Sequence, residues 1–355
     1  MLYQTTNPHG GDLYSRPITL DFSANTNPLG TPEAVKQAVR DCLDCLHQYP
    51  DPYCRELTAA ISAFEQVPVE KILCGSGAAE LIFSYCSALR PKKALELAPT
   101  FSEYSAALES VGCQVERYSL KQNKDFALDE EFLSFLEKGY WDVLVLCNPN
   151  NPTGQLLPEK RLDRIAEICY QKNMRLFVDE CFLDLCDEEK AVSLKRKLDA
   201  FPNLFILKAF TKSYGMAALR LGYGLCADTK LLTAMSRSVQ SWNVSLPAQK
   251  AGIAALQEQD FLRKAKKIIR TEREWMKGQL EHIGFYVCPS AVNFLLFYSP
   301  YPLKERLLEQ GIQLRDCANY HDLGEGWYRT AVKLPEQNRQ LMEAIDRIVQ
   351  ERAEE

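Results

Sequence analysis

The sequence KAFTKSYGMAALRLGY, residues 208–223, joins two apolar runs. The run Leu-Phe-Ile-Leu (204–207), which is typical of a buried strand, precedes this stretch. The second run, LGYGLCA (221–227), overlaps the last three residues of the stretch. Lys212 and Arg220 lie in the connecting segment, eight residues apart. Two cations held near the end of a sheet repel each other unless an anion lies between them. The stretch therefore predicts two strands and an anion site beside them.

Outward from this stretch, short apolar runs alternate with amphipathic segments from about residue 70. The helical spacing is clearest in 158–173, where Leu162, Ile165 and Ile168 recur at intervals of three. Alternation of this kind indicates an α/β fold, with a mainly parallel sheet flanked by helices. The expected strands are KILCG (71–75), KALELAP (93–99), WDVLVLC (141–147), RLFVDE (175–180), LFILKAF (204–210) and LGYGLCA (221–227).

The composition changes beyond about residue 258. Residues 261–284 form a long charged amphipathic pattern, typical of a helix, and shorter strand-like and helical segments follow it. We expect a smaller α+β domain here, with DFSANTNPLG near the N-terminus as its companion. The predicted organisation is an N-terminal arm with part of the small domain at 1–45, a large domain at 46–257 and the small domain at 258–355.

Composition excludes several functions. The formal net charge of -5 in 355 residues provides no basic field for nucleic acid. No run approaches the length of a membrane span, and no signal-peptide core is found near the N-terminus, so we expect a cytoplasmic protein without a membrane partner. Thirteen scattered cysteines fit buried thiols in a reducing compartment. Cys42 and Cys45 form a CxxC pair without a second ligand pair, so no metal site is expected.

Polar residues follow three of the expected strands. Asn151 follows 141–147, Asp179 follows Val178, and Lys212 follows 204–210. The carboxyl ends of parallel strands are where open α/β sheets bind ligands. Upstream, Gly75-Ser76-Gly77 precedes a helix expected from Ala78, and free N–H groups at a helix start favour an anion such as phosphate. These side chains are expected to share one site.

The residue types at these positions suit one cofactor. A lysine amine in a cationic, desolvated setting can bind an aldehyde covalently. A carboxylate can keep a ring nitrogen protonated, an asparagine can donate to a ring oxygen, and an arginine can bind phosphate in bidentate fashion. Each residue alone has a commonplace explanation as a turn, a cap or a surface charge. Together they indicate pyridoxal 5'-phosphate.

Longer sequence motifs that are typical of a known family occur over nearly the whole chain. They are HGGD (9–12), DFSANTNPLG (21–30), YPDP (49–52), PTFSEYSAAL (99–108), CNPNNPTG (147–154), DECFLDL (179–185), FTKSYGMAALRLGY (210–223), WNVSLPAQKAG (242–252) and RDCANYHDLGEGWYRTAV (315–332). On these residues the chain resembles fold-type I pyridoxal-phosphate enzymes of the aminotransferase class. Within that class it is similar to the threonine-phosphate decarboxylases of cobalamin biosynthesis, which are relatives of histidinol-phosphate aminotransferase.

The resemblance implies roles for individual residues. Lys212 matches the lysine that binds the cofactor covalently, Asp179 the partner of the ring nitrogen, and Asn151 the residue at the ring hydroxyl. The remaining assignments are a phosphate cup of Gly77, Ala78, Ala79, Thr211 and Arg220, an aromatic stack from Phe101, a carboxylate clamp at Arg329, and substrate-phosphate candidates at His9, Asn25 and Arg315. Tyr49 matches a tyrosine that reaches the neighbouring subunit's phosphate site, which implies a homodimer with shared active sites.

Two positions depart from the aminotransferase pattern. Phe182 stands where many aminotransferases have a tyrosine that bonds the ring oxygen, and the decarboxylases resemble this chain there. Ala209 replaces a hydroxyl residue that often serves the phosphate.

Three functions are compatible with these residues. The resemblance implies decarboxylation of O-phospho-L-threonine, or of O-phospho-L-serine, to an amino-alcohol phosphate; for phosphothreonine this is 1-amino-2-propanol phosphate. The alternative is a histidinol-phosphate type aminotransferase that uses 2-oxoglutarate. A third is a catalytically silent cofactor-binding regulator, which the intact Lys212, Asp179 and Arg220 argue against. The residues alone do not separate decarboxylation from transamination.

Overall fold

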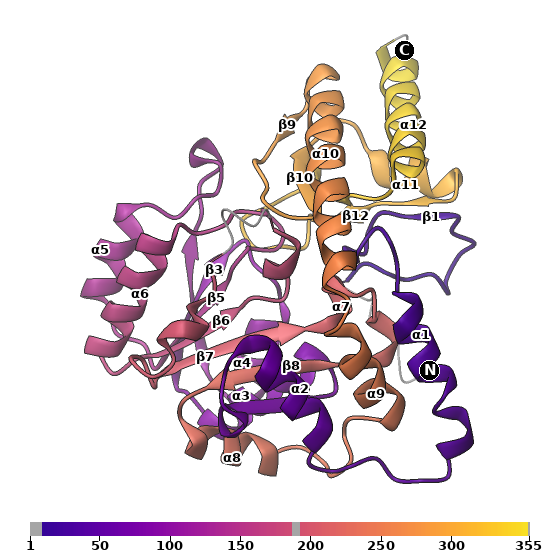
Figure 1. Ribbon diagram of the computed structural model, residues 1–355. Helices are drawn as coiled ribbons and strands as arrows, with labels where there is room; N and C mark the ends of the chain where they lie inside the picture. The colour runs from indigo at the N-terminus through magenta and orange to yellow at the C-terminus, as the bar shows by residue number, and fades with distance from the viewer. Residues whose placement is uncertain (1–8, 187–191, 354–355) are drawn as a thin grey trace.

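A seven-stranded sheet forms the centre of the larger part of the molecule. The computed structural model describes residues 9–186 and 192–353 (Figure 1). The strand order is β2-β8-β7-β6-β5-β3-β4, and only β8 runs antiparallel to its neighbours. The strands are β2 (Ile72–Gly75), β3 (Lys93–Ala98), β4 (Gln114–Ser119), β5 (Val143–Cys147), β6 (Arg175–Asp179), β7 (Leu204–Ala209) and β8 (Gly222–Cys226). All six strands expected from the sequence are present, and the mainly parallel sheet is confirmed.

Helices cover both faces of this sheet. On one face, α3, α4 and α8 pack over residues such as Val145, Phe177 and Phe205, while Leu144, Leu176 and Ile206 face a second apolar cluster that includes α2, α6 and α9. Because successive strand residues point to opposite faces, strands covered on both sides are buried throughout, as β5 and β7 are; β5 is entirely apolar, and β7 is apolar except at Lys208. The helices are α1 (Glu33–Arg40), α2 (Arg55–Glu65), α3 (Gly77–Leu89), α4 (Glu103–Ser110), α5 (Glu130–Lys138), α6 (Glu159–Gln171), α7 (Phe210–Ser213), α8 (Thr229–Arg237) and α9 (Leu246–Ala255).

A smaller antiparallel sheet with its own core packs beside the larger part. Its order is β12-β13-β10-β9, and a separate parallel pair joins β1 to β11. The strands are β1 (Leu20–Asp21), β9 (Tyr286–Val287), β10 (Phe294–Tyr298), β11 (Ile312–Gln313), β12 (Arg315–Asp316) and β13 (Trp327–Ala331). The helices are α10 (Gln259–His282), α11 (Leu303–Glu309) and α12 (Pro335–Ala353). The N-terminal segment thus contributes β1, which pairs with β11.

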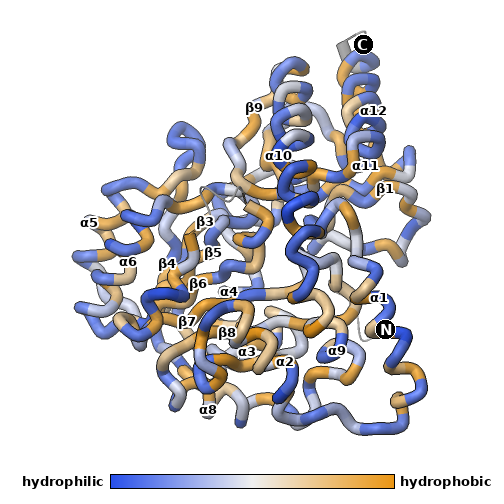
Figure 2. Tube along the Cα trace, in the orientation of Figure 1, coloured by the Kyte–Doolittle hydropathy of each residue, from blue (hydrophilic) through white to orange (hydrophobic). Residues whose placement is uncertain are grey.

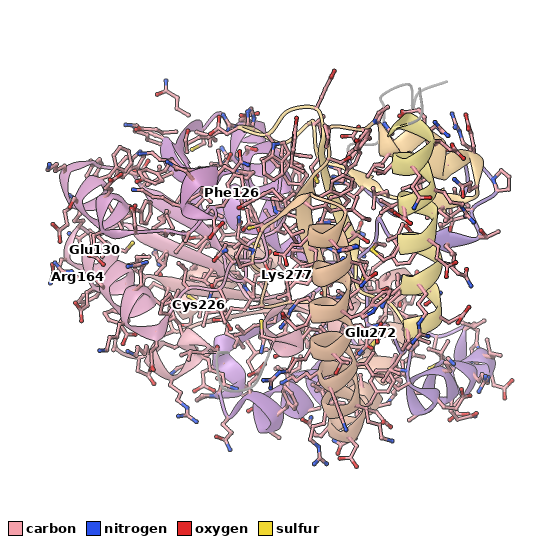
Figure 3. All side chains as sticks on the ribbon, turned by 90° about the horizontal axis from the view of Figure 1, so that it is seen from above. Phe126, Glu130, Arg164, Cys226, Glu272 and Lys277 are labelled. Carbon is pink, nitrogen blue, oxygen red and sulfur yellow. The ribbon has the colours of Figure 1, made fainter. Side chains whose placement is uncertain are left out.

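The two long helices of the smaller part are amphipathic. Hydrophilic and hydrophobic turns alternate along α10 and α12 (Figure 2), and Met276, Leu280, Leu341 and Ile345 join the apolar core. Seen from above, Glu272 lies on the side of α10 that faces α12 (Figure 3), where its Oε2 accepts a hydrogen bond of 2.9 Å from Asn338 Nδ2. Among the described residues, no helix combines the length and apolar character needed to cross a membrane.

Some elements depart from the sequence expectation. Strand β4 was not predicted, because its residues QVERYS lack an apolar run and occupy the edge of the sheet. Residues 312–317, one of the short strand-like segments beyond the long helix, divide into β11 and β12, which pair with different partners. The long helix begins at Gln259, two residues before the expected start.

Candidate active site

The side chains that follow β5, β6 and β7 meet at one edge of the large sheet. The register pairs Cys147 with Asp179 and Asp179 with Leu207, so β5 and β6 end at the same level and β7 continues two residues further, to Ala209. A cavity of about 230 Å³ opens there. Its lining comprises His9, Gly10, Ser23, Ala24, Asn25, Ala78, Ala79, Phe101, Tyr104, Cys147, Asn151, Asp179, Cys181, Phe182, Ala209, Thr211, Lys212, Arg220, Arg315, Tyr320 and Arg329. Of the predicted site residues, only Gly77 and Tyr49 are missing from this lining.

Asp179 lies at the bottom of the cavity with both carboxylate oxygens engaged. Tyr104 Oη donates to Oδ2 at 2.6 Å, and the backbone N–H of Cys181 donates to Oδ1 at 2.8 Å. Burial raises the pKa of the Asp179 carboxyl, while these hydrogen bonds and the positive charge of Lys212 oppose the rise. A carboxylate fixed in this way is oriented to accept from a protonated ring nitrogen.

Lys212 lies on α7, directly after β7. Burial and the positive charges of Arg329 and Arg220 together lower the pKa of its amine to about 8. A lysine with this pKa is neutral in about a tenth of molecules at about pH 7, far more than one with the ordinary value of about 10.4, and the neutral amine is the nucleophile. Nζ also lies 5.5 Å from the centre of the Phe182 ring.

The start of α3 and Arg220 together form a cup for an anion. Glu80 Oε2 accepts from Ser76 N at 2.7 Å, and the following N–H groups belong to the first turn of the helix, where they lack intrahelical acceptors. Gly77 has φ +84°, and a Cβ at that position would lie 2.9 Å from Arg220 Nη2. The absence of a side chain at Gly77 therefore allows the Arg220 guanidinium to approach the start of α3. Gly77 itself is not part of the cavity lining.

Asn151 is bound by residues from the small sheet. Arg329 Nη1 donates to Asn151 Oδ1, and Tyr320 Oη lies 3.4 Å from the same oxygen. With Oδ1 accepting, the amide NH₂ of Asn151 remains the donor for a ring oxygen. Arg329 Nη2 also donates to the Ser23 carbonyl at 2.8 Å, while its buried Nε has no partner among the described residues.

The predicted substrate-phosphate residues His9, Asn25 and Arg315 all line the same cavity. His9 Nε2 lies 2.7 Å from Glu103 Oε1, and this hydrogen bond lowers the pKa of the Glu103 carboxyl. Arg315 lies over the Tyr320 ring at 5.2 Å and donates to Asn319 Oδ1 at 2.7 Å. Asn25 is 1% exposed, and neither of its amide atoms has a partner within the part of the chain that the structure describes.

Tyr49 lies outside this cavity, on the surface. It is 79% exposed, and its ring lies 4.8 Å from that of Trp242. Cys42 and Cys45 line a separate hollow beside Tyr49. Across residues 9–186 and 192–353, no group of three or more histidine, cysteine, aspartate or glutamate side chains is arranged to hold a metal ion.

Sequence reasoning missed two tyrosines of the site. Tyr104 and Tyr320 both line the cavity, and each contacts a residue that had been identified, Asp179 and Asn151 respectively. Tyr104 belongs to the motif PTFSEYSAAL and Tyr320 to the motif that begins RDCANY. Both motifs contribute to the family resemblance, but neither tyrosine is assigned a role from the sequence. No local signal specifies a contact made 75 or 169 residues away.

The donors and acceptors present fit the cofactor expected from the sequence. A buried carboxylate, an asparagine amide, a lysine of lowered pKa and a glycine-lined cup with an arginine surround one cavity at the carboxyl edge of the sheet. Fold and cavity together define a fold-type I enzyme whose cofactor is pyridoxal 5'-phosphate. The sequence matches the family Aminotransferase class I and II over residues 17–345, and the chain belongs to this family.

Similar members of the family are described as two different kinds of enzyme. The chain is 37% identical to the threonine-phosphate decarboxylase of Salmonella typhimurium, covering 96% of each chain. It is 34% identical to the histidinol-phosphate aminotransferase of Methanosarcina mazei, covering 92% of this chain and 87% of that one. The solved histidinol-phosphate aminotransferase of Clostridium acetobutylicum superposes with a TM-score of 0.86 at 26% identity, covering 94% of this chain and 99% of that structure.

Proposed function

We propose that the protein decarboxylates O-phospho-L-threonine, with O-phospho-L-serine as a close second substrate, and forms 1-amino-2-propanol phosphate for cobalamin biosynthesis. The observation that carries this proposal is the presence of Arg315 and Arg329 in the same cavity as Lys212. Two arginines suit a ligand with both a carboxylate and a phosphate. The similarity to the Salmonella enzyme over 96% of the chain supports the same choice.

The cofactor site follows from the geometry at the strand ends. In this proposal Lys212 binds the cofactor aldehyde, Asp179 faces the ring nitrogen, and Asn151 donates to the ring oxygen. The phosphate lies in the cup of Gly77, Ala78, Ala79, Thr211 and Arg220, and Phe101 covers one face of the ring. When bound, pyridoxal 5'-phosphate withdraws electrons from a bond broken at the substrate's α-carbon.

Residues of the small sheet orient the substrate. Arg329 holds the substrate carboxylate, and its unpartnered Nε is an additional donor for it. His9, Asn25 and Arg315 hold the phosphate, for which the unpartnered Asn25 amide supplies a buried donor. Lys212 is the acid that returns a proton to the α-carbon after carbon dioxide has left. Fixing the carboxylate direction is an orientation effect, which can contribute several kcal/mol.

Product analysis distinguishes decarboxylation from the alternative of transamination. Purified protein is incubated with O-phospho-L-threonine, with and without 2-oxoglutarate, and the products are identified by mass spectrometry. We expect carbon dioxide and 1-amino-2-propanol phosphate in both reactions. Glutamate formed only when the keto acid is present would instead establish an aminotransferase. Cofactor binding without turnover of any phosphorylated amine would support the silent regulator.

The role of Lys212 has a direct chemical test. Treatment of the wild-type protein with borohydride should reduce the covalent link and leave the cofactor mass on the chain. Lys212→Ala should show no such mass increase, because the neutral amine that attacks the aldehyde is gone. A retained, reducible cofactor in Lys212→Ala would place the covalent link on another lysine.

We further propose a cytoplasmic homodimer with shared active sites. Tyr49 and Trp242 form an exposed aromatic pair, and Leu43, Leu46 and Tyr53 are also exposed nearby in sequence. Exposed aromatic and aliphatic side chains of this kind are typical of an interface. In the dimer, Tyr49 reaches the phosphate site of the partner subunit. All thirteen cysteines are free thiols, which fits a reducing compartment.

A further inference from the structure

The helix that carries Lys212 is too short to satisfy its own carbonyl groups. Helix α7 contains only four residues, Phe210–Ser213, and the chain then turns at Gly215, which has φ +61°. The last carbonyl groups of any α-helix have no N–H donor within the helix. The carbonyls of Lys212 and Ser213 therefore need donors from another part of the chain.

A single residue from the N-terminal segment supplies both donors. The backbone N–H of Asn27 donates to Lys212 O at 3.0 Å, and its side-chain Nδ2 donates to Ser213 O at 2.8 Å. Asn27 is itself fixed, because its Oδ1 accepts from Leu29 N at 2.9 Å and its side chain is 2% exposed. Buried hydrogen bonds with this geometry hold both partners in place.

The contact extends over the following residues. Thr31 Oγ1 donates to the Gly215 carbonyl at 2.7 Å, and a Cβ on Gly215 would lie only 2.4 Å from the Gly30 carbonyl oxygen. The two backbones are thus in van der Waals contact along 27–31 and 212–215. Movement of either segment must displace the other.

The same N-terminal segment reaches the substrate side of the cavity. Ser23 O accepts from Arg329 Nη2, Asn25 lines the cavity, and Asn293 Nδ2 donates to Thr26 O at 3.2 Å. The segment that contains Asn27 therefore contacts both a residue proposed for substrate binding and the backbone of Lys212.

We infer that Asn27 is a positioning residue for the cofactor-binding lysine, acting as a cap on α7 from the N-terminal segment. This inference rests on the assignment of Lys212 in the proposed function. Without the cap, the carbonyls of Lys212 and Ser213 lose their donors and the backbone of Lys212 is free to shift. A misplacement of about 1 Å can slow a reaction about 100-fold.

The test measures cofactor capture rather than turnover. Cofactor is removed from wild type, Asn27→Ala and Asn27→Asp, and the rate of pyridoxal 5'-phosphate uptake and the pH midpoint of the bound cofactor's absorbance are recorded. Both variants keep the backbone donor to Lys212 O and lose the side-chain donor to Ser213 O, and Asn27→Asp also keeps the acceptor for Leu29 N. We expect uptake to be slowed about 10-fold or more in both variants, together with a shifted midpoint.

Asn203→Ala is the matched control. Asn203 also donates from Nδ2 to a backbone carbonyl, Met174 O at 2.7 Å, but it precedes β7 at the opposite end from α7. Its loss should lower the melting temperature without changing uptake or the midpoint. Uptake at the wild-type rate in Asn27→Asp, or equal slowing in Asn203→Ala, overturns the inference. If borohydride leaves a cofactor on Lys212→Ala, the assignment of Lys212 fails instead.

Discussion

Two lysines four residues apart have opposite electrostatic surroundings. Lys208 is buried between two carboxylates, with Nζ 2.9 Å from Glu65 Oε1 and 3.0 Å from Asp184 Oδ1, and these charges raise the pKa of its amine. Lys212 lies near Arg220 and Arg329 instead, and burial with these cations lowers the pKa of its amine to about 8. The fold thus keeps one lysine charged for structure and makes the other available for chemistry.

The pKa of Lys212 sets the pH dependence of cofactor capture. Because only the neutral amine attacks an aldehyde, the uptake rate of cofactor-free protein should rise with pH and level off above about 8. A lysine with the ordinary value of about 10.4 would continue to accelerate well beyond that point. The uptake rate is measured by stopped-flow absorbance at intervals of about one pH unit between about pH 6 and 10, and the midpoint of its rise gives the pKa of Lys212. A midpoint near the ordinary lysine value would contradict the prediction.

Removal of the charge on Lys208 should destabilise the fold strongly. Lys208→Met leaves Glu65, a buried carboxylate, with one cation fewer, and breaking a buried ion pair costs about 3 to 5 kcal/mol of unfolding free energy. Lys121→Met, which breaks the exposed pair with Glu131, should cost less than about 1 kcal/mol. Urea unfolding of both variants provides the comparison. An equal decrease in the free energy of unfolding in both variants would show that the buried ion pair stabilises the fold no more than the exposed one.

The turn into α3 depends on the absence of a side chain at Gly77. In Gly77→Ala, a Cβ would press on Arg220 Nη2 and strain a backbone at φ +84°, so the dissociation constant for the cofactor should rise about 10-fold, which corresponds to about 1.4 kcal/mol. Gly112→Ala is the matched control, because Gly112 has φ +79° but no atom within 4 Å of its added Cβ. Both variants should lose similar stability, whereas only Gly77→Ala should bind the cofactor more weakly in equilibrium titration. Equal binding by both would exclude a role for the close approach of Arg220.

The individual elements were predictable to different degrees. Strands β5, β6 and β7 contain apolar runs because they are buried on both faces, and these runs predicted Asn151, Asp179 and Lys212 at one edge. Strand β4 has no such run, because an edge strand with half-buried residues tolerates polar side chains. The contacts of Asn151 with Arg329 and of Asn27 with α7 join segments from distant parts of the chain, and no local pattern encodes them.

For the molecule as a whole, the dimer proposal predicts complementation between damaged subunits. Lys212→Ala lacks the lysine in its own cavity, and Tyr49→Ala lacks the tyrosine that we place in the partner's cavity. A mixed dimer contains one site with both defects and one site with none. After subunit exchange, a mixture of the two variants should recover about a quarter of wild-type activity, since about half of the dimers are mixed.

Sedimentation of the same samples provides the control for this experiment. A dimer without recovery of activity would mean that Tyr49 does not serve the partner's site. A monomer at working concentration would remove the shared-site proposal altogether.

The pairing of β1 with β11, which lie far apart in the sequence, also has a consequence for the order of folding during synthesis. Thr19 bonds to Gly311 across 292 residues, and β1 finds its partner only in β11. A ribosome releases the chain from the N-terminus onward, so the strands that present Asp179 and Lys212 emerge long before Arg315 and Arg329. A nascent chain can thus form the sheet edge that receives the cofactor while the side of the cavity that selects the substrate is still being translated.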